Sequence, residues 1–388
     1  MSADGRRQGS PILFLLTIWR FVKIDFRFLH RSAIIKEEHK KNGVISLRKR
    51  TICLLLALLM LAVCVLPACG EIETTEETQA VKKDPVRDPA EDGKLNILMV
   101  GNSFCYYYVE ELYALLKEST PAGISEINIY NLYYSGCSLT QHFNWWTAGE
   151  AHYDLYKTGA VGRNKQGDDG GWTLEEALAM EDWDYISLQG TLKGASYIKD
   201  EPAQLHSDMA MLAAPLLNRF HEVAPGAQLL WHRTWYSEVG RVATDGYVYM
   251  EEDGPKYDAG MQAACDYMCG EFCKDKPYDL LMVNCGKAWT KARELNKTAD
   301  VLPYGGLCAR LGQEKFGDHR ENAGDGYHDG DIGGAQLLNA YVWYMTITGD
   351  RDLSDSKYEP EYTRDGKTYT LTKEHIAMLK EAAESVFQ

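Results

Sequence analysis

Basic residues are scarce in this sequence of 388 residues, which holds 41 Lys and Arg against 56 Asp and Glu and has a net charge of −15. Residues 1–68 contain 12 of the basic and only 4 of the acidic residues, so 29 basic and 52 acidic residues follow, with a net charge of −23. Such an acidic surface argues against nucleic acid or anionic lipid as a partner, because phosphates are repelled. It fits a neutral or acetylated substrate better.

Long apolar runs are scarce as well. Ile52–Leu66 contains 15 residues, whereas a membrane-spanning helix needs about 20. Three basic residues at 48–50 precede this run, and Leu66-Pro67-Ala68-Cys69 closes it, which is the order of a secretory signal. The cysteine after Leu-Pro-Ala resembles a bacterial lipobox, which implies cleavage before Cys69 and lipid on its sulfur. The alternative is a short transmembrane anchor.

These features divide the chain into parts. We interpret residues 1–47 as an over-extended start, with translation beginning near Val44, and residues 48–68 as a lipoprotein signal peptide. The polar composition of the next stretch predicts a flexible linker over residues 69–93. The main domain is expected over residues 94–350. Asp365-Gly366 between two tyrosines indicates a hairpin, which with a final helix forms a C-terminal addition packed on the domain at residues 351–388.

Strand-like and helix-like segments alternate along the main domain. Strands are predicted at 95–100, 126–133, 184–189, 227–232 and 279–284. Helices are predicted at 104–118, 174–181, 202–223, 258–274, 286–295, 331–348 and 373–386. The alternation indicates an α/β fold with three layers, in which helices cover both faces of a parallel sheet of about five strands. Gly159–Trp172 carries five glycines and is expected to be a surface excursion near the sheet edge.

A serine follows the first strand. The apolar run Ile97–Val100 stops at Gly101, and Asn102 and Ser103, both favoured helix N-cap residues, come next. Ser103 is therefore predicted in a tight strand-to-helix turn at the carboxyl edge of the sheet, where open α/β folds place their ligands. Unpaired N–H groups and a helix dipole there would stabilise a developing oxyanion. The alternative is that Ser103 merely caps a helix.

A glycine-rich loop near the end of the domain supplies a possible base. Gly324–Gly330 places Asp325 three residues before His328 and leads directly into a predicted helix. A serine nucleophile needs a base, and that base needs an orienting carboxylate. Asp325 and His328 share one loop, so the chain contains all three groups.

The Gly-Asn-Ser-Phe block after the first strand and the late Asp-x-x-His resemble the SGNH (GDSL-like) hydrolases. More narrowly, the chain resembles a bacterial exported subgroup described only as a domain of unknown function, DUF4886. Further matching blocks are Ser135–Leu139, Leu174–Leu178 with Trp183–Gln189, and Asp325–His328. The resemblance covers roughly residues 94–350 and implies an SGNH or flavodoxin-like fold.

The resemblance also implies roles for individual residues. Ser103 is the expected nucleophile, His328 the base and Asp325 its orienting group. The N–H groups of Ser103 and Gly136 are expected in the oxyanion hole. The wider family adds an asparagine side chain, where this chain offers Gln189. Alternatively, Gln189 only ties the following loop to the sheet.

Other polar and aromatic residues are candidates for binding substrate. Asn102 lies beside the serine, His142 follows the Gly136 loop, and Trp145 and Trp146 are expected in loops, where they can form platforms for sugar rings or pack the excursion onto the sheet. His232 ends the fourth strand and is a further candidate. Cys265, Cys269 and Cys273 repeat every fourth residue without a nearby histidine, so buried thiols or one disulfide are favoured over a metal site.

Together these features predict a lipid-anchored hydrolase on the extracytoplasmic face of the cell membrane. It would hydrolyse an ester, for example an acetyl group on a carbohydrate, through an acyl-enzyme. No metal or organic cofactor is implied. The alternative is a catalytically silent surface lipoprotein that binds glycans through the same cleft.

Overall fold

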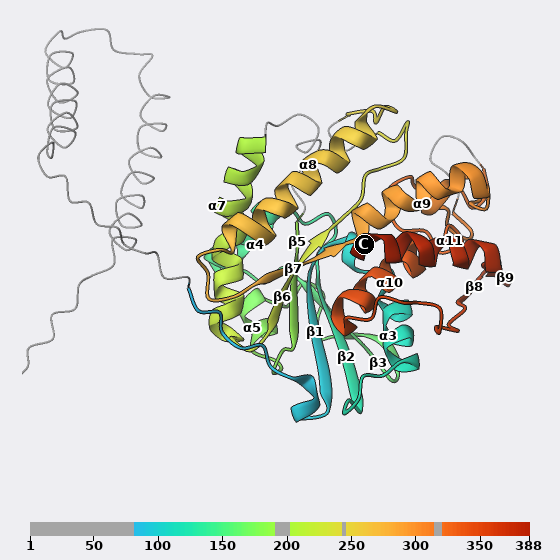
Figure 1. Ribbon diagram of the computed structural model, residues 1–388. Helices are drawn as coiled ribbons and strands as arrows, with labels where there is room; N and C mark the ends of the chain where they lie inside the picture. The colour runs from blue at the N-terminus through green and yellow to red at the C-terminus, as the bar shows by residue number, and fades with distance from the viewer. Residues whose placement is uncertain (1–80, 191–201, 243–245, 314–319) are drawn as a thin grey trace, which may run out of the picture. The chain divides into compact units, whose positions relative to one another are not determined.

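The computed structural model describes residues 81–190, 202–242, 246–313 and 320–388, and the elements are labelled in Figure 1. The predicted leader, the signal peptide and Cys69 lie outside the described residues. Within those ranges, none of the helices combines the length and apolar character needed to cross a membrane.

The domain is built on a seven-stranded sheet with the order β4-β3-β2-β1-β5-β6-β7 (Figure 1). Five neighbouring strands run parallel, and each occupies a position predicted from the sequence: β1 (Lys94–Gly101), β2 (Glu126–Tyr133), β5 (Tyr185–Gln189), β6 (Gln228–Arg233) and β7 (Leu280–Asn284). Strands buried on both faces have nearly continuous apolar sequences, which is why these five are recognisable. The winding direction changes between β1 and β5, and such a point is where doubly wound sheets bind ligands.

An antiparallel hairpin extends the sheet beside β2. It consists of β3 (Asp154–Gly159) and β4 (Gly162–Gln166). The predicted parallel sheet of about five strands and the excursion near the sheet edge are confirmed, whereas the two antiparallel strands within the excursion were not predicted. Most side chains of this hairpin are polar and only partly buried, so they produce no apolar run.

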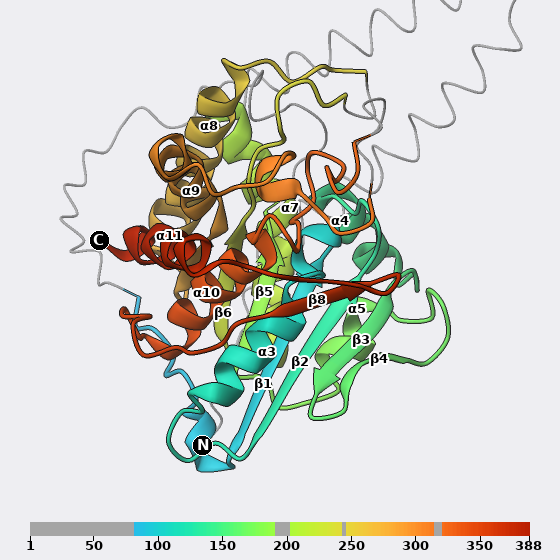
Figure 2. The ribbon, with the colours of Figure 1, turned by 90° about the vertical axis from the view of Figure 1, so that its right-hand side faces the viewer.

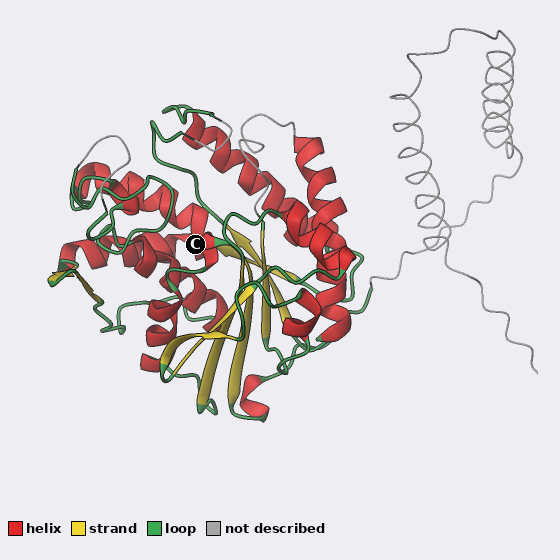
Figure 3. Cartoon of the chain, turned by 180° about the vertical axis from the view of Figure 1, so that it is seen from behind, coloured by secondary structure: helices red, strands yellow, loops and turns green. Residues whose placement is uncertain are grey.

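Two hydrophobic cores flank the sheet and make three layers (Figures 1 and 3). Leu95, Ile97 and Met99 of β1 pack on one side, whereas Leu98 and Val100 pack on the other. The first core includes α3 (Val109–Glu118), α9 (Cys285–Ala299), α10 (Ala335–Thr348) and α11 (Lys373–Glu384). The second includes α4 (Leu139–Ala148), α5 (Leu174–Leu178), α7 (Pro202–Val223) and α8 (Asp253–Tyr267). The predicted α/β/α class is confirmed.

Several helix boundaries differ from the sequence-based prediction. α3 begins at Val109 rather than 104, because Ser103–Cys105 forms a 3-10 turn (η2). α10 begins at Ala335 rather than 331, after Gly334 with a φ of 76°. The other short helical turns are η1 (Pro89–Glu91), η4 (Gly306–Cys308), η5 (Ser385–Phe387) and a π-helical turn, η3 (Met268–Phe272), directly after α8.

The segment before β1 is attached to the domain. The backbone N–H of Asp84 donates to the carbonyl of Pro277 at 2.7 Å, and that of Arg87 donates to the carbonyl of Gly226 at 2.8 Å. The polar composition predicted a flexible linker up to residue 93, but composition does not report where backbone groups bond. The linker prediction is therefore wrong for this segment.

The C-terminal addition has the predicted form. β8 (Glu361–Arg364) and β9 (Lys367–Thr370) make a hairpin whose turn residues Asp365 and Gly366 both have positive φ, as a two-residue hairpin turn requires (Figure 2). Tyr362 and Tyr369 of the hairpin pack on Leu311 and its neighbours. α11 packs in the same core as α9 and α10.

Candidate active site

The turn after β1 is fixed by a close approach of backbone and side chains. A Cβ atom at Gly101 would lie 2.6 Å from Oε1 of Gln189 and 2.8 Å from Sγ of Cys105, so only glycine fits there. Asn102 caps η2, and its side chain accepts from the N–H of Phe104 at 3.0 Å. The predicted tight turn at Ser103 is confirmed. The predicted effect of a helix dipole at Ser103 is not confirmed, because α3 begins six residues after this serine.

The loop that carries Asp325 and His328 brings both residues to Ser103. Oγ of Ser103 lies 2.6 Å from Nε2 of His328, and Nδ1 of His328 lies 2.6 Å from Oδ2 of Asp325. The loop requires glycine at 324, where φ is 72° and a Cβ atom would lie 1.8 Å from the carbonyl oxygen of Cys308. The three side chains therefore form a continuous hydrogen-bonded chain from carboxylate to hydroxyl.

The Asp325 carboxylate is held in its ionised form. Burial acts to raise its pKa, but the His328 imidazole and the backbone N–H groups of His328 and Tyr327 outweigh this effect and lower the pKa to about 2. Those N–H groups donate to Oδ1 of Asp325 at 3.0 and 3.2 Å. Because Asp325 accepts at Nδ1 of His328, that nitrogen carries the proton and Nε2 is left to accept one.

Three aromatic rings surround the imidazole of His328. Its ring centroid lies 3.9 Å from that of Tyr327, 5.3 Å from Tyr107 and 5.8 Å from Phe104. Ser103 itself is 7% exposed, so its hydroxyl is accessible only from a narrow direction. Tyr107 was not predicted as a site residue, and its one feature in the sequence is its place in a run of three tyrosines after the serine.

Gly136 lies in an exposed turn next to Ser103. The turn closes with a hydrogen bond from the N–H of Cys137 to the carbonyl of Tyr134, and Gly136 has a φ of 68°. Nδ2 of Asn102 donates to the carbonyl of Cys137 at 2.7 Å and ties this turn to the serine. Within the described residues, the N–H groups of Ser103 and Gly136 donate to no other group. Both remain candidates for an oxyanion hole.

The side chain of Gln189 is hydrogen-bonded to Asn102. Its Nε2 donates to Oδ1 of Asn102 at 2.8 Å, and its Oε1 accepts from the backbone N–H of Asn102 at 3.2 Å. These bonds do not support the predicted oxyanion role of Gln189. They also correct the prediction that Asn102 binds substrate, because Asn102 is 3% exposed and both its side-chain polar atoms bond within the protein. Both residues fix the turn that holds Ser103.

The residues expected in loops around the cleft belong to the helical layer. Ser138 and Gln141 form a capping box that starts α4, so Trp145 and Trp146 lie on a helix, and the loop prediction is wrong. His142 on α4 is 1% exposed and its Nδ1 lies 2.8 Å from the hydroxyl of Tyr153, so it cannot contact substrate. Burial lowers its pKa to about 3.

Trp146 is partly buried against the core, and His232 is buried completely. Nε1 of Trp146 donates to Oε1 of Glu175 on α5 at 2.7 Å. His232 is fully buried, in ring contact with Trp343 at 5.5 Å. The prediction that His232 borders the site is therefore wrong. This residue lies near the end of β6, but its side chain is covered by the helical layer and does not reach solvent.

The cysteines are free thiols in the described part of the chain: Cys105, Cys137, Cys265, Cys269, Cys273, Cys285 and Cys308. No cluster of three His, Cys, Asp or Glu side chains suited to a metal ion occurs among these described residues. Cys265 in α8, Cys269 in η3 and Cys273 directly after η3 thus contribute to packing rather than to a crosslink.

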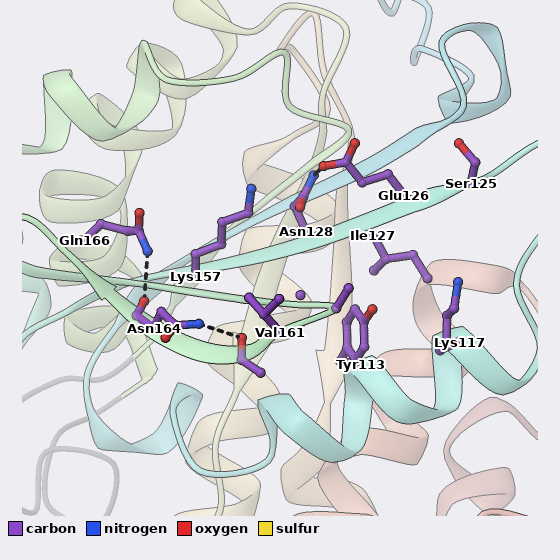
Figure 4. Close-up of a pocket in the computed structure, with 13 residues that line it drawn as sticks. Tyr113, Lys117, Ser125, Glu126, Ile127, Asn128, Lys157, Val161, Asn164 and Gln166 are labelled. Carbon is purple, nitrogen blue, oxygen red and sulfur yellow. Dashed lines mark hydrogen bonds between the residues drawn. The ribbon is translucent and has the colours of Figure 1, made fainter.

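A cavity of about 520 Å³ lies away from the triad (Figure 4). It opens at the start of β2, whereas Ser103 follows the carboxyl end of β1, the opposite edge of the parallel strands. Tyr113 and Lys117 of α3 face residues of the β3–β4 hairpin across it (Figure 4). It is not part of the catalytic arrangement.

The model of the family DUF4886, a domain of unknown function, matches residues 96–264. The match covers less than half of the chain. No curated protein matches the chain.

Several solved structures resemble this chain. A DUF4886 family protein from Bacteroides uniformis ATCC 8492 has 22% identity and a TM-score of 0.55, with 76% of this chain and 95% of that chain covered. Another structure is that of a protein from Parabacteroides merdae ATCC 43184 assigned as a GDSL-like lipase. It has 17% identity and a TM-score of 0.37, with 69% of this chain and 97% of that chain covered. A carbohydrate esterase family 3 protein from Talaromyces cellulolyticus has 10% identity and a TM-score of 0.31, covering 66% and 97%. At these identities the likeness concerns the fold alone.

Proposed function

We propose that the protein is a serine ester hydrolase that acts through an acyl-enzyme. The observation that carries this proposal is the unbroken chain of hydrogen bonds from Asp325 through His328 to Ser103, with 2.6 Å at each of the two contacts of the imidazole. A serine that only caps a helical turn needs no such partner. The arrangement matches a nucleophile, its base and the group that orients the base.

The reaction would proceed in two halves. Oγ of Ser103 attacks the ester carbonyl and transfers its proton to Nε2 of His328, while Asp325 stabilises the imidazolium that forms. The imidazolium then gives the proton to the leaving alcohol, and the acyl group stays on Ser103. Water, deprotonated by His328, attacks the acyl-enzyme and releases the acid and free Ser103. The N–H groups of Ser103 and Gly136 supply the donors for the tetrahedral oxyanion.

The proposal extends to the class of substrate and to the cellular location of the protein. We infer an ester of a small molecule or a carbohydrate, with an acetyl group as one case, and no nucleic acid partner. The protein would be anchored by lipid at Cys69 on the extracytoplasmic face of the cell membrane. The rival glycan-binding function loses support, because two of its expected aromatic platforms belong to the helical layer.

A direct assay tests the proposed chemistry. Purified protein is incubated with 4-nitrophenyl acetate and with acetylated sugars, and product release is compared with that of Ser103→Ala. We expect turnover by the wild type and a loss of at least about a thousandfold in kcat for the variant. Equal turnover by both proteins, with both folded by circular dichroism, would reject the serine mechanism.

A further inference from the structure

Two arginines stand beside the rings that enclose His328. We propose that the ester substrate carries a carboxylate near its scissile bond and that Arg241, assisted by Arg310, binds this anionic group. The inference rests on the proposed function and deepens it, because it names the chemical class of substrate for the same site. It also differs from the expectation of a neutral substrate, which came from net charge alone.

Of these two arginines, Arg241 is the one whose charge is less offset. Its guanidinium carbon lies 3.8 Å from the ring centroid of Tyr327, and its NH1 donates to Oγ of Ser237 at 2.9 Å. No carboxylate lies within 4 Å of this guanidinium in the part of the chain that the structure describes. Three other arginines with reduced exposure do pair with carboxylates: Arg219 with Glu175, Arg233 with Asp258, and Arg293 with Glu238.

The acidic groups around Arg241 are already engaged. Glu238, three residues earlier in the chain, accepts from NH2 of Arg293 at 2.7 Å. Asp325 accepts from Nδ1 of His328 and from two backbone N–H groups. Among the residues that the structure describes, the Arg241 guanidinium donates only to the neutral hydroxyl of Ser237. It therefore retains donors for a ligand, because Arg carries five N–H groups.

Arg310 adds positive charge on the other side of the imidazole. Its guanidinium carbon lies 4.0 Å from the ring centroid of Tyr107, and its NH2 donates to the carbonyl oxygen of Asp329 at 2.9 Å. The fully buried Asp329 carboxyl offsets part of this charge. Arg310 therefore assists the binding of an anion, whereas Arg241 supplies the larger share of the available positive charge.

The positions of both arginines fit a substrate group close to the reacting carbonyl. Tyr327 and Tyr107, on which they stack, lie 3.9 and 5.3 Å from the imidazole between ring centroids. A short acyl chain or a single sugar ring spans such a separation. Stacking on an aromatic face holds the planar guanidinium group in a fixed orientation. A guanidinium held in this way binds a carboxylate through two parallel hydrogen bonds.

Local charge decides substrate binding more than net charge does. The chain carries −15 overall, so an anionic ligand would be repelled except where positive charge is gathered. An acidic protein with two cations beside its nucleophile is suited to select an anionic ester. The carboxylate can belong to the acyl part, as in a dicarboxylic monoester, or to the alcohol part, as in an acetylated uronic acid.

The test compares matched pairs of esters on the full protein. In the first arm, mono-4-nitrophenyl succinate is compared with 4-nitrophenyl butyrate. In the second arm, an acetylated methyl galacturonoside is compared with the acetylated methyl galactoside. The measured quantity is the ratio of kcat/KM for the anionic over the neutral ester. Arg241→Gln removes the charge and Arg241→Lys keeps it. Arg351→Gln is the control, because Arg351 stacks on Phe387 at 3.9 Å in the same manner at the C-terminal end of α10.

We expect the wild type to prefer the anionic ester by about ten- to a hundredfold in one arm, the size of a charge-assisted hydrogen-bonded pair. Arg241→Gln should bring the ratio close to one, Arg241→Lys should keep part of it, and Arg351→Gln should keep all of it. A ratio near one for the wild type in both arms, in a protein that still turns over esters, would overturn the inference and leave the proposed function intact. Absence of any turnover, together with no labelling by a fluorophosphonate, would instead reject the proposed function.

Discussion

Proton transfer in the site depends on which nitrogen of His328 is protonated. The ionised Asp325 accepts at Nδ1, and this leaves Nε2 facing the hydroxyl of Ser103. Since the pKa of Asp325 is about 2, this carboxylate stays ionised throughout the pH range in which His328 acts as a base. The orientation of the imidazole is therefore set before substrate arrives.

Removing either partner should give graded losses. His328→Ala deletes proton transfer, whereas Asp325→Asn keeps a hydrogen-bonding group but loses control of tautomer and imidazolium charge. We expect His328→Ala to lower kcat at least as much as Asp325→Asn, with losses of about a thousandfold or more for each. Steady-state kinetics on one ester measure both. A silent Asp325→Asn would place the orienting group elsewhere.

The Gln189–Asn102 pair should behave as one unit. Each single substitution, Gln189→Ala or Asn102→Ala, breaks the buried hydrogen bond at 2.8 Å, displaces Ser103 and lowers both kcat and the free energy of unfolding. The double variant should be little worse than either single one, with a coupling energy of about 1–2 kcal/mol in a denaturant-unfolding cycle. Losses that simply add would show that the two side chains act independently.

Residue identities in the triad were accessible from the sequence, but their supporting contacts were not. Ser103, Asp325 and His328 lie in short motifs whose spacing reflects the chemistry. The position of Gln189 at the end of a strand predicted its location correctly, yet its bond to Asn102 depends on side-chain geometry that no pattern encodes. Arg241 gave no signal at all, since its role depends on a tyrosine far along the chain.

Helix α3 buries a carboxylic acid among apolar residues. Glu111 is 6% exposed, and its Oε2 has no hydrogen-bond partner within the described residues. Burial, with smaller contributions from Glu110 and Asp329 against Arg163, raises the pKa of Glu111 to about 8. The folded protein therefore keeps a proton that the unfolded chain releases from about pH 4.5 upward, and stability falls as the pH rises through this window.

Replacing this acid with an amide should remove that loss. We expect the melting temperature of Glu111→Gln to match the wild type near pH 4.5 and to exceed it by about 5 °C at pH 8, because the raised pKa corresponds to a few kcal/mol. Glu110→Gln, an exposed neighbour on α3, is the control and should follow the wild-type profile. Parallel profiles for Glu111→Gln and the wild type from pH 4.5 to 8 would contradict the burial effect.

Helices and strands could be predicted where burial leaves a recognisable pattern of apolar residues in the sequence. The five parallel strands are covered on both faces and appear as apolar runs, whereas β3 and β4 at the sheet edge carry mostly polar side chains. Helix α4 escaped prediction because its capping box directly follows a turn and its first apolar residue is a single leucine. Edge position and local capping, rather than weak propensity, thus account for the missed elements.

The proposed location concerns the whole molecule and rests on residues outside the described ranges. If Cys69 is the lipidated N-terminus, mass spectrometry of the membrane fraction should find an acylated peptide that begins at this residue. The reason is that a cysteine placed after Leu-Pro-Ala and a basic, apolar leader is the expected site of cleavage. Peptides from residues 1–40 in the mature protein would contradict both the anchor and the proposed start near Val44.

The central claim is that Ser103 is an activated nucleophile within a folded α/β domain. Incubation of the purified protein with a fluorophosphonate, followed by intact-mass measurement and peptide mapping, tests this claim most directly, because such probes need a serine whose proton a base removes. We predict a single adduct, located on the peptide that contains Ser103, and no adduct on Ser103→Ala. A folded wild type that gains no mass, or an adduct retained by the alanine variant, would contradict the account.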